Sequence, residues 1–168
     1  MKYMYVLTHQ FGQFPIGIWA VLAMLFVGGG VFTIFGQALS LLNWDAALRL
    51  RLQEDSRKSR DPVESTMGAM SQGEAVADVV VQGALILLAS AGILLQHPVG
   101  FVAGIAQGVI WIYVTFLVLS QRWMLYRWEI VNNMARLKHV APAMLLVAGI
   151  PGALIITCLV ANRGFFGW

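Results

Sequence analysis

The fold is decided by residues 76–120, VADVVVQGALILLASAGILLQHPVGFVAGIAQGVIWIYVTFLVLS. This stretch contains one charged residue, Asp78, and two apolar runs, residues 76–95 and 99–120, which are separated by residues 96–98. About 20 helical residues cross a hydrocarbon core of roughly 30 Å, so each run is long enough to span a bilayer. Because the connection is so short, the two helices must form an antiparallel hairpin.

Two further apolar runs flank this hairpin. The first covers residues 14–36, with Pro15 predicted in its first helical turn, and it could continue as helix to residue 42. The last covers residues 140–161. We therefore predict an all-α polytopic membrane protein, a four-transmembrane-helix bundle in which residues 1–168 form a single membrane domain.

The composition of the chain agrees with this prediction. Hydrophobic residues make up 59% of the chain and charged residues only 11%, whereas a soluble domain carries roughly a quarter charged residues. The mean hydropathy is +0.74. The single cysteine, Cys158, lies in an apolar run, which excludes an intrachain disulfide and paired-cysteine redox chemistry.

The basic residues predict the orientation in the membrane. The connection at residues 44–75 holds five Lys and Arg and the amphipathic segment at residues 121–139 holds four, against Lys2 and Arg163 on the other side. Short loops rich in Lys and Arg stay in the cytoplasm, so both termini are expected outside it, with a bacterial inner membrane as the default host. We attribute the net charge of +3 to topology and to contact with anionic lipid, and expect no nucleic-acid partner.

The sequence alone leaves the secondary structure of these two connections undecided. Residues 44–52 could extend the first helix or lie along the headgroups, and residues 65–73 are predicted to form a loop. Residues 121–139 could extend the third span or lie in the interface.

Small residues at helical spacing indicate close helix contacts. Glycine allows two backbones to approach in a membrane, whereas proline inside a span removes a helix hydrogen bond and predicts a kink. The predicted packing residues are Gly28, Gly29, Gly30, Gly100, Gly104, Gly108 and Pro151.

Asp78 is the strongest candidate for a functional residue, because charged groups inside a membrane are costly. Glu74 and Gln82 lie four residues on either side and share its helix face. One hypothesis is a groove at the inner surface that accepts a proton or cation, closed by Arg122 or Arg127. Two alternatives are favoured over this groove: Asp78 caps the start of its helix near headgroup water, and the three residues form a polar seam that fixes helix packing.

Gln107 is deeper in its span and needs a hydrogen-bond partner, for which Thr33 and Thr157 are candidates. His97 and His139 are predicted on opposite sides of the membrane. His9 could approach His97, but two histidines without a carboxylate make a weak metal site, so no metal and no cofactor is expected. Hydrolase, zinc and nucleotide signatures are missing from the sequence.

Three classes of function follow. The favoured one is a non-catalytic accessory or structural subunit of a membrane complex, with a protein partner or a second copy in the membrane. The second is an oligomeric transporter or channel with a polar path near Asp78, Gln82 and Gln107. The third is an interfacial enzyme acting on a lipid or quinone. Two four-helix families are excluded, because thiol-oxidising quinone reductases need paired cysteines and small multidrug transporters need a glutamate in the first span.

Overall fold

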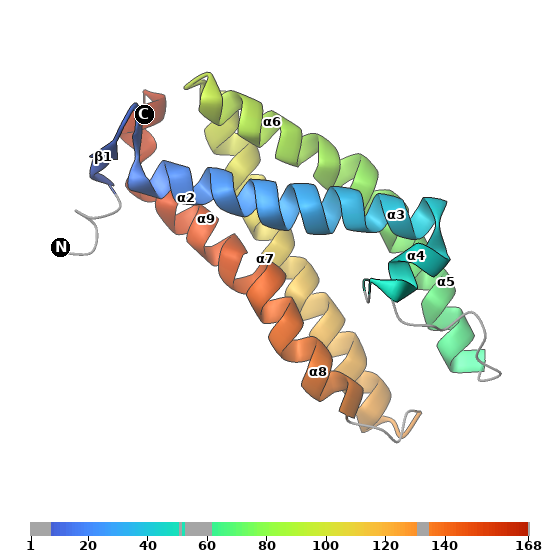
Figure 1. Ribbon diagram of the computed structural model, residues 1–168. Coiled ribbons are helices and arrows are strands. Elements are labelled where there is room, and N and C mark those ends of the chain that lie inside the picture. Colours follow the sequence, from blue (N-terminus) through green and yellow to red (C-terminus); the bar gives the residue numbers. More distant parts are fainter. Residues whose placement is uncertain (1–7, 51, 53–61, 131–134, 168) are drawn as a thin grey trace. The chain divides into compact units, whose positions relative to one another are not determined.

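The computed structural model describes residues 8–50, 52, 62–130 and 135–167 (Figure 1). Four of its helices are long and apolar enough to cross a membrane, and the predicted all-α class with four spans is confirmed. These spans are Ile16–Leu42, Ser65–Leu94, Pro98–Arg127 and Val140–Ala161.

A small β-hairpin precedes the first span. Its strands are β1 (Gln10–Phe11) and β2 (Phe14–Pro15), and Gly12 supplies the positive φ of +67° that the turn requires. The prediction that Pro15 lies in the first helical turn is wrong. Its ψ of 147° is extended, because its neighbour Phe14 pairs with Phe11 and holds the backbone in the ladder.

The first span is one continuous helix. It consists of α2 (Ile16–Met24), the wide π-helical segment η1 (Leu25–Gly36) and α3 (Gln37–Leu42). Asn43 ends it with a φ of −149° and caps the separate helix α4 (Trp44–Arg49), because its Oδ1 accepts a hydrogen bond from Ala46 N at 3.1 Å. Residues 44–49 therefore do not extend the span.

The second span begins well before the apolar run. The span starts at Ser65, within α5 (Pro62–Ala77), and continues through the wide segment η2 (Asp78–Gln82) and α6 (Gly83–Leu94). The predicted loop at residues 65–73 is wrong, since this stretch is helical. Pro62 suits a first turn, and the Ser65 and Thr66 hydroxyls donate to its carbonyl at 3.0 and 2.7 Å. The packing of α5 against α3 outweighs the weak helix propensity of the glycines in α5.

The third span, α7 (Pro98–Arg127), is longer than the predicted residues 99–120. His97 caps its first turn, because His97 Nδ1 accepts a hydrogen bond from Val99 N at 3.2 Å. At its other end Glu129 has a φ of +57°, which a right-handed helix does not allow. The first part of the amphipathic segment thus extends this span.

The fourth span begins at Val140, within α8 (Ala135–Met144), and continues through the wide segment η3 (Leu145–Gly149) and α9 (Ile150–Ala161). The wide turns lie immediately before Pro151, where proline cannot donate the usual helical hydrogen bond. A short 3₁₀ turn, η4 (Arg163–Phe166), follows the span.

The chain forms two compact units, which we describe separately. The first combines the described parts of Met1–Gly28 and Leu85–Trp168, and the second is Gly29–Ala84. In the first unit α9 packs against both α2 and α7 (Figure 1). In the second unit α3 packs against α5 and η2.

Candidate polar site and helix contacts

Asp78 and Gln82 form a hydrogen-bonded pair in the second unit. Gln82 Nε2 donates to Asp78 Oδ1, and only 5% of the Gln82 surface is exposed. The segment η2, which carries both residues, packs against α3. On α3 the buried Ser40 hydroxyl donates to the Gln37 carbonyl at 2.7 Å. Polar side chains therefore lie on the segments of this unit that pack together, η2 and α3.

Glu74 differs from Asp78 in its surroundings. It lies four residues earlier on the same helix, but its side chain is exposed, whereas Asp78 is half-buried. Ala75, its neighbour, is buried instead. The predicted stripe of three polar residues is thus divided between the hydrogen-bonded Asp78–Gln82 pair and the exposed carboxylate of Glu74.

The Asp78–Gln82 pair is expected to contribute modestly to stability. In a double-mutant cycle with Asp78→Ala and Gln82→Leu, we expect a coupling free energy of about 0.6–1.7 kcal/mol, the range for polar pairs in membranes. Unfolding of the purified protein in mixed detergent micelles measures it. Glu74→Gln is the matched control and should change stability by less than about 0.5 kcal/mol. A coupling indistinguishable from zero would contradict a stabilising pair.

Gln107 belongs to the first unit and is completely buried, with 0% of its surface exposed. Thr157, one of its predicted partners, is exposed and donates to the Ala153 carbonyl of its own helix at 2.8 Å. Thr33, the other candidate, belongs to the second unit. Gln107 is therefore part of a packed helix interior rather than of an open surface.

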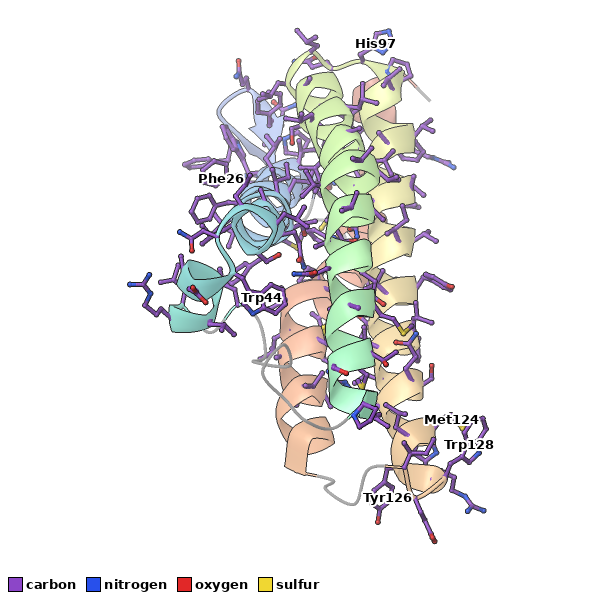
Figure 2. All side chains as sticks on the ribbon, turned by 90° about the vertical axis from the view of Figure 1, so that its right-hand side faces the viewer. Phe26, Trp44, His97, Met124, Tyr126 and Trp128 are labelled. Atoms are coloured by element: carbon purple, nitrogen blue, oxygen red, sulfur yellow. The ribbon has the colours of Figure 1, made fainter. Side chains whose placement is uncertain are left out.

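Arg122 and Arg127 lie far from Gln107 along the same helix. By the helical rise of 1.5 Å per residue they are about 22 and 30 Å away along the axis. Figure 2 shows their end of α7 by the labelled residues Met124, Tyr126 and Trp128, with His97 at the opposite end. The structure thus separates these arginines from the deep glutamine.

The glycines of α7 lie in close helix contacts within the first unit. Gly100 faces the backbone of Gly92 across the hairpin, and a Cβ atom on Gly108 would lie 2.8 Å from the Gly152 carbonyl oxygen. A Cβ atom on Gly104 would lie 2.6 Å from Leu159 Cδ1.

The three consecutive glycines of the first span differ from one another. A Cβ atom on Gly28 would lie 2.7 Å from the Trp111 ring, whereas one on Gly30 would meet nothing within 4 Å. Gly29 is buried. Only part of this triplet is therefore required by close packing.

Two contact residues were missed by sequence reasoning. Gly92 faces Gly100. The sequence feature that could have indicated this contact is that one glycine precedes the hairpin turn at residues 96–98 and the other follows it within a few residues. The Thr115 hydroxyl is buried, donates to the Trp111 carbonyl at 2.8 Å and lies 3.4 Å from the Met144 carbonyl oxygen. An isolated threonine in an apolar run carries no sequence signal for such a position.

Aromatic rings join the two ends of the first unit's sequence. Phe14 contacts Trp19 and Phe165 with ring centroids 5.2 and 5.4 Å apart, and Phe166 contacts Phe101 and Phe165 at 5.7 and 5.0 Å. Trp19 Nε1 also donates to the Phe11 carbonyl at 2.9 Å. Phe14 and Phe166 are both buried. This aromatic cluster closes the end of the unit.

Candidate metal ligands do not gather in the described part of the chain, where no three His, Cys, Asp or Glu side chains come together. His9 and His97 are both exposed, and His97 caps α7. The His139 side chain lies outside the described residues.

These features define an integral membrane protein with four helices able to span the bilayer, a buried polar pair and glycine-mediated helix contacts. No protein-family model, no curated protein and no solved structure matches the chain.

Proposed function

We propose that the protein is a non-catalytic accessory or structural subunit of a membrane complex, placed in a bacterial inner membrane with both termini outside the cytoplasm. One observation carries the proposal: α5 has an open face of small residues. A Cβ atom on Gly73 would meet nothing within 4 Å, and Ala69 and Ala77, four residues before and after it, are exposed.

This face suits a second helix from another chain. Small residues at intervals of four allow two helix backbones to approach closely, which favours dispersion contacts over contacts with mobile lipid tails. The equivalent glycines of α7, Gly104 and Gly108, contact α9 within the same chain. The open face of α5 therefore supports an intermolecular contact.

The distribution of charge supports the proposed orientation. Four charged residues lie within the candidate spans: Glu74, Asp78, Arg122 and Arg127. Glu74 and Asp78 are in the first half of the second span, and the arginines are near the end of the third. Since the turn between these spans is short, all four lie toward the same side, and arginine is retained in the cytoplasm.

Replacing Gly73 with leucine tests the subunit proposal. The Cβ atom of a leucine at this position would meet nothing within 4 Å and the side chain would cover the open face, so we expect the monomer to remain folded while the complex dissociates. Native electrophoresis of detergent-solubilised membranes should then show the shift from a larger species to the 18.4 kDa chain. Val76→Leu, on the same helix at a site that is 50% exposed, is the control.

The outcomes of this experiment separate the alternatives. A larger species built only from this chain identifies a homo-oligomer, and one containing a second polypeptide identifies a hetero-complex. If wild-type protein migrates as a monomer, or if both variants leave the complex intact, the proposal is wrong.

A further inference from the structure

The last two turns of α7 carry cationic and aromatic side chains on one face. Arg122, Trp123, Tyr126 and Arg127 lie within about 140° of one another around the helix, since each residue turns the chain by about 100°. The Trp123 and Tyr126 rings lie side by side, with centroids 6.1 Å apart. We call these four residues the α7 basic face.

Three residues of the α7 basic face are exposed, and the fourth, Arg122, is half-buried. Trp123 is 45% exposed and Tyr126 is 38% exposed, and Arg127 is exposed beside them. Trp128, which follows directly, is 70% exposed, and Figure 2 shows it with Tyr126 at the end of the helix. So much exposed ring surface beside arginine is costly in water and favourable where water meets hydrocarbon.

The length of α7 places this face at headgroup depth. The helix has 30 residues, so it is about 45 Å long, close to the thickness of a bilayer with its headgroups. The apolar part of the helix fills the core of about 30 Å, and the α7 basic face falls just beyond it.

Phosphate is the group that this face fits best. A guanidinium binds phosphate oxygens through two parallel hydrogen bonds, and tyrosine and tryptophan add a hydroxyl and an indole N–H at the same depth. Glu129 is the one carboxylate in residues 98–130, so the local charge remains positive.

We propose that the α7 basic face binds the headgroup of an anionic phospholipid, with Arg122 and Arg127 holding the phosphate and the two rings packing on the glycerol backbone. The site is structural and anchors the third span. The inference rests on the membrane placement proposed above, but it does not depend on the presence of a partner subunit.

Native mass spectrometry of the full chain, released from detergent with added lipid, tests the proposal. Phosphatidylglycerol is the anionic probe and phosphatidylcholine the zwitterionic one. Each arginine near anionic lipid contributes about fivefold in affinity, so Arg122→Gln with Arg127→Gln should weaken phosphatidylglycerol binding about 30-fold. Phosphatidylcholine carries the same phosphate, but its choline cation offsets the charge, so it should bind more weakly and lose less affinity in this variant.

Two further variants keep the result interpretable. Arg163→Gln removes one positive charge at the opposite end of the molecule and should leave phosphatidylglycerol binding unchanged. Arg122→Lys with Arg127→Lys keeps the charge but loses the two-pronged hydrogen bonding, so it should retain part of the affinity. Circular dichroism shows whether each variant keeps its helices.

The proposal would be overturned if wild-type protein bound the two lipids equally, or if Arg163→Gln weakened phosphatidylglycerol binding as much as the double glutamine variant. The same holds if the folded double variant bound phosphatidylglycerol as wild type does. None of these results depends on the Gly73 experiment. The lipid site and the subunit role are therefore tested independently of each other.

Discussion

Replacing Gly100 with alanine is expected to destabilise the protein by about 3 kcal/mol or more, which is a large effect for one added methyl group. The new Cβ atom would meet backbone atoms of Gly92 and Ile93. Backbone cannot move aside by changing a rotamer, so α6 and α7 must separate where the hairpin closes. Unfolding in mixed detergent micelles gives the free-energy difference.

Gly30→Ala is the matched control for Gly100→Ala. The same substitution in η1 introduces a Cβ atom that meets nothing within 4 Å. It should leave stability unchanged or raise it by up to about 1 kcal/mol, because alanine has the higher helix propensity. Equal effects at the two glycines would contradict the close contact between Gly92 and Gly100.

Phe14→Ala should produce a loss of about 3–5 kcal/mol, the usual cost of removing a buried phenyl ring. Phe14 is 1% exposed and contacts both Trp19 and Phe165, so its loss leaves a cavity between the N-terminal hairpin and η4. Near-ultraviolet circular dichroism should weaken in parallel, because the Trp19 ring loses its fixed neighbour. Thermal unfolding in one detergent measures the loss.

Phe26→Ala is the control for this second prediction. Phe26 is 72% exposed, and Figure 2 shows its ring directed outward from the first span. Its removal should change stability by less than about 0.5 kcal/mol. If the two phenylalanines had similar effects, the aromatic cluster would not be a stabilising core.

The spanning helices could be predicted because the hydropathy of the sequence is sufficient to identify them. A run such as residues 99–120 has no soluble alternative, and the short turn at residues 96–98 leaves only a hairpin. The start of the second span was not predictable in this way. Residues 65–73 are polar and contain Gly73, so they resemble a loop, while the packing of α5 on α3 that makes them helical is a tertiary effect.

The candidate site could be predicted only in part. The spacing of Asp78 and Gln82 by four residues placed them on one helix face, and they share a hydrogen bond. The same spacing suggested that Glu74 joined them, but its side chain is exposed. Spacing defines neighbours on a helix, whereas burial depends on which face the next helix covers.

Two of the three wide helical segments have a sequence signal, the glycine triplet Gly28–Gly30 in η1 and the proline that follows η3. η3 precedes Pro151, which explains its position through a missing hydrogen-bond donor.

Labelling of single cysteines in intact cells tests the central claim most directly. Starting from Cys158→Ala, His97→Cys marks the hairpin end of α7 and Glu129→Cys marks its other end, both at exposed positions. A membrane-impermeant maleimide should label the cysteine at position 97 in intact cells and the one at position 129 only after permeabilisation. Labelling of both positions in intact cells, or the reverse order, would contradict a third span that crosses the membrane with its arginine-rich end in the cytoplasm.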